Sequence, residues 1–291
     1  MSVVFHKMHG CGNDFVFIDN RSMRLGREFM PVWARTFCDR KTGVGADGIL
    51  FIGDVPKDSG CDYRWDFYNS DGSRGEMCGN ASRCSCLLAA MLGIAGNEQA
   101  FLTDAGPVTA RIRHRTEGTA TVTSRLTRPF GFRSTVLAVG GRERTVYSLT
   151  EGVPHAVLFS EDLEAEDVDG IGRFLRQHAY FAPDGTNVNF VRVDGPDNIA
   201  VRTYERGVEA ETLACGTGSS ASVWICARLG MTGNSVSVAT RGGETLGVSL
   251  EGDDVFLTGA AAHVFTGETD PCFVLPGLPQ KTPPRLFCDM A

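Results

Sequence analysis

The sequence predicts a mixed α/β fold in which one domain plan is used twice. Thirty-five glycines and 12 prolines among 291 residues favour many short strands joined by turns over a helical bundle. Short apolar segments typical of strands recur along the chain, and a few stretches with helical periodicity interrupt them. Short strings of the first half also return in the second half, in the same order.

The composition is that of a globular protein. Hydrophobic residues make up 42% and charged residues 22% of the chain, which excludes disorder and fibrous repeats. The net charge of −7 argues against a broad nucleic-acid footprint. We find neither a signal peptide nor an apolar run of about 18 residues, so we expect a cytoplasmic protein with no membrane partner.

The first half is expected to alternate strands with two helices. Strands are predicted within 3–19, at 49–53, at 63–69 and from about 100 to 124, and a helix is predicted at 31–39. A second helix begins in CGNASRCSCLLAAMLG and ends at Gly93. Leu87, Leu88, Met91 and Leu92 should form its buried face.

The second half is expected to repeat this plan after a polar, turn-rich stretch at 123–132. We therefore divide the chain into domains 1–124 and 125–267, with the Pro-rich tail 268–291 returning to the first domain. The predicted elements are strands at 144–149, 155–159, 189–194 and 199–206, helices at 168–178 and 215–230, and four more short strands up to about residue 265.

Two pairs of strings carry the repeat. NDFVFID (13–19) resembles VNFVRVD (188–194), and CGNASRC (78–84) resembles CGTGSSA (215–221). The first pair is 175 positions apart and the second 137, which suggests a duplicated domain whose copies received different insertions. Chance similarity of short strings is the alternative. A duplicated domain favours a site between the copies, with one matching group from each.

Ten cysteines are the unusual feature of the composition. A reducing cytosol leaves thiols free, so most of them should be buried packing residues. No pairs at zinc-finger spacing, no H-E-x-x-H and no redox C-x-x-C occur, so no metal site is expected. Cys78 and Cys215 differ, because each opens a predicted helix, where unpaired backbone N–H groups favour an anion and lower the pKa of a thiol. Each alone is equally well a packing residue, but the matched pair indicates chemistry.

Two such cysteines facing one carbon suggest the inversion of a stereocentre. A thiolate would remove a proton from one face of the carbon, and a thiol would return a proton to the other face. Gly79 and Gly216 let the backbone approach a carboxylate, which the free N–H groups would hold while charge develops beside it. The chain has only four lysines and none lies in a clear cofactor loop, so no pyridoxal cofactor is expected.

Segments spread over the chain resemble the diaminopimelate epimerase family. They are HGCGNDF (9–15), FYNSDGSRGEMCGNASRC (67–84), VPHAV (153–157), TNVNF (186–190), YERG (204–207), ETLACGTG (211–218) and TGAAAHVFTG (258–267). The resemblance implies two pseudo-symmetric α/β domains, each a mixed β-roll around a central helix, with the active site in the cleft between them. It also implies cofactor-independent interconversion of LL- and meso-2,6-diaminopimelate, in lysine and peptidoglycan precursor synthesis. A homodimer with Phe265 at its interface is implied as well.

The resemblance assigns roles to individual residues. The acid/base pair is matched by Cys78 and Cys215, and the positions thought to tune the two thiols are matched by His155 and Glu205. The substrate-binding positions are matched by Asn13, Asn69, Gly79, Asn80, Asn187, Glu205, Arg206, Gly216 and Thr217. Arg206 would form a bidentate interaction with the distal carboxylate. Each residue also has a structural reading when taken alone: a buried histidine for His155, turn or strand-edge residues for Asn13 and Asn187, and a surface ion pair for Glu205 and Arg206.

Three departures from the family pattern concern substrate recognition. Val153 replaces an asparagine of many members, Gly48 stands where some have glutamine, and ERGVEAET is one residue longer than the commonest form. The alternative within the same chemistry is a two-cysteine racemase of another amino acid, such as histidine or proline. A phenazine-biosynthesis-like isomerase shares the fold but lacks the cysteine pair, and a thiol-rich binding or redox module would require unreactive cysteines.

Overall fold

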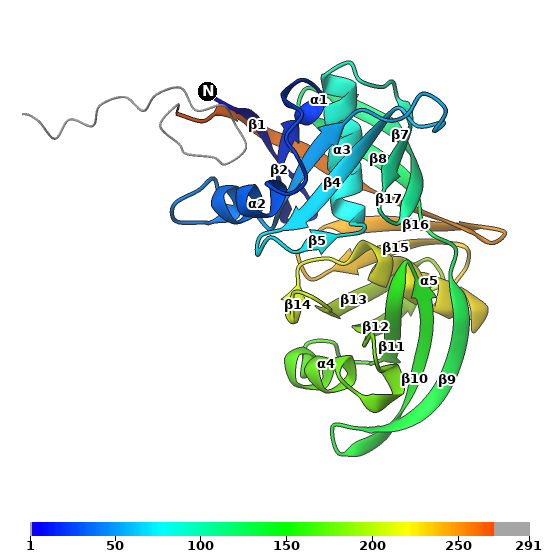
Figure 1. Ribbon diagram of the computed structural model, residues 1–291. Helices are drawn as coiled ribbons and strands as arrows, with labels where there is room; N and C mark the ends of the chain where they lie inside the picture. The colour runs from blue at the N-terminus through cyan, green and yellow to red at the C-terminus, as the bar shows by residue number, and fades with distance from the viewer. Residues whose placement is uncertain (1, 271–291) are drawn as a thin grey trace, which may run out of the picture.

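The structure, a computed structural model, describes residues 2–270 and contains two halves, each built around one central helix (Figure 1). The first half contains β1 (Val4–Gly10), β2 (Asn13–Asp19), α1 (Asn20–Met23), α2 (Met30–Cys38), β3 (Gly48–Gly53), β4 (Tyr63–Asn69), β5 (Arg74–Gly75), α3 (Gly79–Met91), β6 (Glu98–Thr103), β7 (Gly106–Thr116) and β8 (Thr119–Arg125). The second half contains β9 (Phe130–Val139), β10 (Arg142–Glu151), β11 (Val153–Phe159), α4 (Val168–Arg176), the 3₁₀ helix η1 (Ala179–Phe181), β12 (Asn187–Gly195), β13 (Asn198–Glu205), β14 (Ala210–Thr212), α5 (Gly216–Arg228), β15 (Ser235–Thr240), β16 (Thr245–Glu251) and β17 (Asp254–Glu268). Among residues 2–270, no helix is long and apolar enough to cross a membrane.

The strand pairings of the first half recur in the second. In the first half β1 pairs with β2 antiparallel, β2 with β3 parallel, β3 with β4 antiparallel and β4 with β6 parallel. In the second half β10, β11, β12, β13 and β15 repeat these four pairings in the same order and orientation. The predicted mixed α/β fold with one plan used twice is therefore confirmed.

The topology also shows which strings correspond. The strand β2 occupies the place of β11, whereas β12 occupies the place of β3, so the predicted correspondence of 13–19 with 188–194 is wrong. Half-buried strands share the same alternation of apolar and polar residues, and this explains the false match. The helix match of α3 with α5 is confirmed. Gly48 and Asn187, the first residues of β3 and β12, are 139 positions apart, close to the 137 between the helix starts, so different insertions are not required.

The sheet encloses α3 on every side, so this helix has no single buried face. Every residue from Gly79 to Ala89 is buried, whereas Met91 and Leu92 are 41% and 37% exposed in the last turn. The prediction that both belong to the buried face is therefore wrong, because a helix inside a rolled sheet is buried by position along its axis rather than around it. The helices α2 and α4 cover the outer faces of the two halves with further apolar cores.

The last strand joins the two halves. We predicted four short strands at the end of the chain, but the structure has three, and the third, β17, is 15 residues long (orange in Figure 1). Its first residues pair with β16 of the second half, and the following ones pair with β8 and β1 of the first half. Its central glycine and alanines have low strand propensity and suggested a break. The division into domains stays a prediction, and all but the first residues of the predicted returning tail lie outside the described residues.

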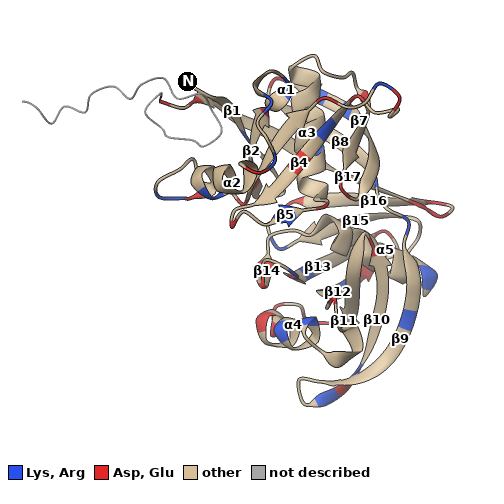
Figure 2. Cartoon of the chain, in the orientation of Figure 1, with Lys and Arg blue, Asp and Glu red and all other residues tan. Residues whose placement is uncertain are grey.

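Charged side chains of both signs lie interspersed on both halves in the view of Figure 2. One of their ion pairs is buried: Arg144 on β10 donates from both arms to Glu166, at 2.8 and 3.0 Å, and both side chains are under 10% exposed. Breaking such a pair leaves a buried charge without its partner, so this contact matters for the stability of the second half.

Candidate active site

The first turns of α3 and α5 abut each other where the two halves meet. Cys78 and Cys215 are the N-cap residues of these 13-residue helices. A Cβ placed on Gly79 would be 3.8 Å from the Cα of Gly216 and 3.3 Å from a methyl of Leu257, so a larger residue has little room here. The lack of side chains lets two helix N-termini, with their unpaired N–H groups and positive dipole ends, converge on one place.

Equivalent hydrogen bonds within each helix stabilise the two helix starts. The hydroxyls of Ser82 and Ser219 each donate to the carbonyl oxygen of the preceding N-cap cysteine, in both cases at 2.9 Å. The Gly218 N–H donates to the Cys215 sulfur at 3.3 Å. A Cβ on Gly218 would be 3.2 Å from that sulfur, so this glycine leaves space for the thiol.

Burial opposes ionisation of both thiols, and the predicted lowering of their pKa is wrong for the free protein. Loss of solvation raises the pKa of Cys78 to about 11, although the backbone N–H groups of Ala81 and Asn80 lower it in part. Loss of solvation likewise raises the pKa of Cys215, and the nearby Glu205 carboxyl adds to the rise. Helix N-termini favour a thiolate, but around these two sulfurs, Cys78 half-buried and Cys215 buried, the loss of solvation has the larger effect.

The predicted polar site residues stand at strand ends, and those of Asn69 and Glu205 are equivalent in the two halves. Asn13 and Asn187 are the first residues of β2 and β12, and Asn69 and Glu205 are the last residues of β4 and β13. Gly48 pairs across the sheet with Asn69, which is exposed. The parallel strands that start here and the antiparallel strands that end here therefore bring these side chains to one edge of each half.

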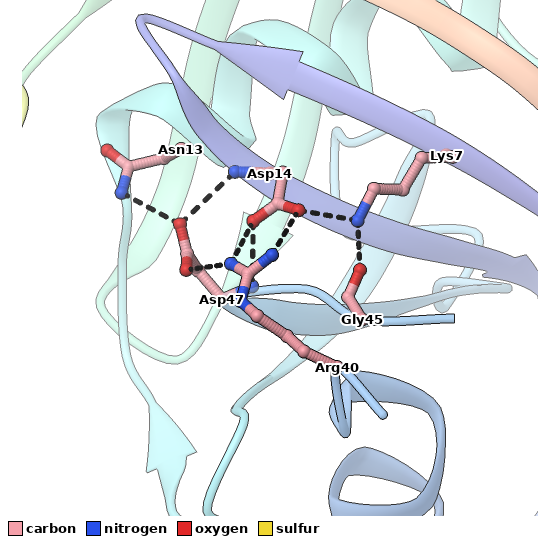
Figure 3. Close-up of polar contacts among 6 residues, drawn as sticks. All are labelled: Lys7, Asn13, Asp14, Arg40, Gly45 and Asp47. Carbon is pink, nitrogen blue, oxygen red and sulfur yellow. Dashed lines mark hydrogen bonds and ion pairs between the residues drawn. The ribbon is translucent and has the colours of Figure 1, made fainter. Parts of the chain in front are cut away.

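In the first half, Asn13 is held by a charged network (Figure 3). Its amide nitrogen donates to Asp47 at 3.2 Å, and Arg40 bridges Asp47 and Asp14 at 2.8 and 2.9 Å. Lys7 donates to Asp14 at 2.6 Å and to the Gly45 carbonyl. Burial alone would raise the pKa of Asp14, but the hydrogen bonds from Arg40 and Lys7 lower it to about 2, so this anchor stays charged.

The same asparagine reaches the helix starts. The amide nitrogen of Asn80 donates to Asn13 Oδ1 at 2.5 Å and to the carbonyl of Ala214 at 3.3 Å. Ala214 directly precedes Cys215. One hydrogen-bonded path therefore joins the charged network of the first half to the start of α5 in the second.

In the second half, His155 is fully buried and neutral. Burial, together with a smaller effect of the Arg206 charge, lowers its pKa to about 3. Asn189 contacts His155 Nδ1 at 3.3 Å, while Nε2 has no partner among the described residues. Asn189 also accepts from the Thr203 hydroxyl at 2.9 Å, so three buried polar side chains position one another.

Arg206 and Glu205 do not form an ion pair with each other. Arg206 donates to the Asp184 carbonyl at 3.1 Å and makes no ion pair within residues 2–270, and its backbone N–H donates to Asn187 at 2.7 Å. Glu205 accepts from the Thr212 hydroxyl at 2.9 Å, and burial raises its pKa. The guanidinium of Arg206 is therefore available to a carboxylate ligand.

Comparison with known proteins agrees with this arrangement. The family model described as diaminopimelate epimerase matches residues 5–127 and 147–264. The chain belongs to the diaminopimelate epimerase family. The diaminopimelate epimerase of Aquifex aeolicus is 43% identical over 273 residues, which cover 90% of this chain and 96% of that protein. That of Archaeoglobus fulgidus is 41% identical over 278 residues, which cover 92% and 96%.

Solved structures of other epimerases and isomerases share the fold. A hydroxyproline epimerase from Agrobacterium vitis superposes with a TM-score of 0.68 at 17% identity, covering 96% of this chain and 94% of its own. A phenazine biosynthesis protein of the PhzF family from Bacillus anthracis gives a TM-score of 0.71 at 14% identity, covering 92% and 99%. At these identities the comparison shows the architecture common to the diaminopimelate epimerase family and these proteins.

The structure brings together most of the residues predicted for this epimerase site. The exception is Asn69, which is exposed and donates to Ser73 at 3.0 Å. Two surface hollows of about 520 and 310 Å³ lie elsewhere and are lined by none of the predicted residues. Within the described part of the chain, no group of three or more His, Cys, Asp or Glu side chains is placed to hold a metal ion.

Several residues at the site were missed in the sequence. They are Asp47, Arg83, Glu151 and Asn189. Arg83 stands inside the CGNASRC string, so its position was visible, but nothing local showed that the sheet would bury it completely. Glu151 and Asn189 lie in strand segments of ordinary composition, and only the fold brings them beside α5.

Proposed function

We propose that this protein is a diaminopimelate epimerase that interconverts LL- and meso-2,6-diaminopimelate without a cofactor, by proton transfer between Cα and two cysteines. The observation that carries the proposal is the contact between two helix starts, each capped by a cysteine, in a chain of this family. We place the enzyme in the cytoplasm, in lysine and peptidoglycan precursor synthesis.

The α-carboxylate of the substrate would bind at the junction of the two helices. The backbone N–H groups of Gly79, Asn80, Gly216 and Thr217 belong to first turns and have no partner within their helices. They would neutralise the carboxylate and stabilise the negative charge that spreads onto it when Cα loses its proton. Since these donors are fixed by the fold, they need no reorganisation during the reaction.

Cys78 and Cys215 would face Cα from opposite sides. In one direction, the thiolate of Cys78 takes the α-proton, and the electron pair of the broken Cα–H bond remains on Cα as a carbanion. The thiol of Cys215 then delivers its proton to the other face of Cα. The enzyme is then left with a thiol at Cys78 and a thiolate at Cys215, and the reverse reaction exchanges the roles. Binding of a substrate ammonium beside the buried thiols would favour the thiolate that burial disfavours in the free enzyme.

The distal end of the substrate would be recognised by the strand ends. Arg206 would pair with the distal carboxylate, and Glu205 would accept from an ammonium group, as would the amide oxygens of Asn13, Asn69 and Asn187. His155 and Glu205 would tune the two thiols. At positions 48 and 153, where other members have polar side chains, this chain has Gly48 and Val153. The alternative, a racemase of another amino acid such as histidine, is not favoured by the curated relatives.

We also propose a homodimer formed through the β1–β17 face. Val4, Val264 and Phe265 are 52%, 55% and 45% exposed on these two neighbouring strands. Phe265 packs edge-on against Phe5 with ring centroids 6.0 Å apart, so the ring is held in position while half of it remains open. Light scattering of Phe265→Glu should show monomers where the native chain shows dimers. A dimeric variant would disprove this interface.

Exchange in D₂O tests the proposed reaction. Deuterium should enter at Cα of LL-diaminopimelate without added pyridoxal phosphate, and none should enter a panel of other L-amino acids. Cys78→Ala and Cys215→Ala should each abolish epimerisation while retaining the circular dichroism spectrum. Cys61→Ala, a partly exposed thiol outside the site, is the matched control and should stay active. Full activity in either active-site variant would disprove the two-thiol mechanism, and exchange of another amino acid alone would disprove the substrate.

A further inference from the structure

The two cysteine-capped helices match in their backbones but differ in the side chains that follow. Five residues after Cys78, α3 carries Arg83, and five residues after Cys215, α5 carries Ser220. Both are buried completely. A duplicated scaffold therefore places a cation behind one thiol and a neutral hydroxyl at the matching position behind the other.

The partner of each of these residues comes from the matching strand turn. In the first half, the turn between β1 and β2 places Cys11 3.2 Å from Arg83 Nη2. In the second half, the matching turn between β10 and β11 places Glu151, which accepts from the Ser220 hydroxyl at 2.5 Å. The two contacts thus occupy equivalent places in the repeat. The first contains a cation, the Arg83 guanidinium, whereas the second contains an acidic group, the Glu151 carboxyl.

The Arg83 guanidinium is held entirely by neutral acceptors. Its donors reach the Ala260 carbonyl at 3.1 Å, the Gly79 carbonyl at 3.2 Å, Asn80 Oδ1 at 2.6 Å and the Cys11 sulfur. It makes no ion pair within residues 2–270. A Cβ on Gly259 of β17 would lie 2.9 Å from its Nε, so the strand is shaped to admit the group. Its charge therefore acts, uncompensated by a contacting carboxylate, on the first turn of α3.

Glu151 provides the opposite environment behind α5. Its side chain is fully buried, and its second oxygen has no partner among the described residues. The Ser220 hydroxyl that it binds also contacts the Thr217 carbonyl at 3.1 Å, in the first turn of α5. Burial raises the pKa of Glu151 to about 8. The carboxyl is thus neutral near pH 7, and any charge it gains above that pH is negative.

We propose that Arg83 and Glu151 make the two thiols unequal, so that Cys78 loses its proton more readily than Cys215 does. The inference rests on the catalytic roles proposed for the two cysteines. Glu205 opposes ionisation of both thiols, so it favours neither of them as a thiolate. Arg83 favours the charged form of Cys78, whereas no cation counteracts burial at Cys215.

The other charged groups around the site do not reverse this order. Among them, His155 is neutral, Arg206 contacts Asn187 at a strand end of the second half, and Glu244 interacts with Cys11. When the substrate binds, Cys78 releases its proton to solvent, and the enzyme accepts the isomer whose Cα–H points to Cys78. After turnover Cys78 holds the α-proton and Cys215 takes up a proton from solvent, which restores the resting form with two thiols.

Alkylation of the free enzyme with iodoacetamide from pH 7 to 12 tests this order. Peptide mapping resolves both sites: Cys78 is the only cysteine in the tryptic peptide 75–83, and fragment ions separate Cys215 from buried Cys226 in 207–228. The midpoint of the pH profile, rather than the absolute rate, reports the thiolate, because access to the two sulfurs differs. The midpoint for Cys78 should lie at least about one pH unit, or tenfold in ionisation, below that for Cys215.

Variants separate the charge from the packing. Arg83→Gln should remove the difference between the midpoints, while Arg83→Lys, which keeps the charge, should retain most of it. Glu151→Gln should raise the Cys215 rate above pH 8 and leave Cys78 unchanged, and Glu143→Gln, at an exposed site on the same strand, should change neither.

A lower midpoint for Cys215 than for Cys78 would overturn the inference, as would a folded Arg83→Gln with an unchanged difference. If Arg83→Gln does not fold, an unchanged Cys215 profile in Glu151→Gln overturns it. The proposed function fails separately, if a single cysteine variant stays active.

Discussion

The stability of Glu151→Gln relative to the native protein should rise with pH. The carboxyl titrates near its ordinary value of 4.5 in the unfolded chain but at about 8 in the folded protein. Below pH 4.5 both states are protonated and the titration has no effect on folding. As the pH rises, the unfolded state ionises first, so native stability falls by about 1.4 kcal/mol per pH unit until the folded carboxyl also ionises. At pH 7 the loss is about 3 kcal/mol, which the glutamine does not suffer.

The pH dependence, rather than the value at one pH, is the decisive quantity. Glutamine still accepts from Ser220 but places an unpartnered NH₂ where the second oxygen lies, at a pH-independent cost of about 1–3 kcal/mol. Urea unfolding followed by circular dichroism at pH 5, 6, 7 and 8, under reducing conditions, measures the difference from the native protein. Glu143→Gln, exposed on the same strand, is the control and should give a flat difference. A flat difference for Glu151→Gln would refute the buried, protonated carboxyl.

Three further substitutions test the site and its support. Gly218→Ala, whose Cβ would approach the buried amide oxygen of Asn189 to 2.2 Å and the Cys215 sulfur to 3.2 Å, should lower kcat about 100-fold. Gly79→Ala, with a flexible leucine methyl at 3.3 Å, should lower it less than about tenfold in the same assay. Arg206→Lys cannot form the bidentate interaction proposed with the distal carboxylate. It should raise KM about tenfold or more with a smaller change in kcat, measured by initial rates. Arg144→Met leaves the buried Glu166 carboxylate without its partner and should lower the free energy of unfolding by about 3–5 kcal/mol. Adding Glu166→Leu should recover most of that loss in the same denaturation experiment.

The helix starts could be predicted because their signals are local. A cysteine followed by glycine, after a polar turn and before a helical stretch, specifies an N-cap with room for a ligand in both halves. The order of the segments then placed Cys78 and Cys215 in equivalent positions, and the structure brings the adjoining glycines into contact. Strand ends were predictable for the same reason, since each is marked by a turn, and they carry Asn13, Asn187 and Glu205.

What the sequence did not reveal depends on packing between distant segments. The thiol pKa was expected to fall because a helix start favours an anion, but the degree of burial is decided by the meeting of two halves, and burial dominates. Arg83 looks like a surface residue in a polar string until the sheet closes around α3. We expected several short strands at the end of the chain, although small residues such as Gly259 let one long strand, β17, pass the guanidinium. In each case the deciding neighbour is more than 100 positions away.

The repeat also explains how one site can treat two stereoisomers alike at one carbon and still hold the rest of the substrate in one orientation. The groups proposed to surround the reacting carbon are matched pairs, with a cysteine and a glycine from each helix, so both faces of that carbon meet the same chemistry. The strand ends around them are matched in position but not in type: the place of Asn69 in the first half is taken by Glu205 in the second. Inversion of the reacting carbon requires equivalent groups on both of its faces, whereas recognition of the rest of the substrate requires the two halves to differ. A duplicated fold supplies both when its copies diverge at the strand ends while keeping the helix starts.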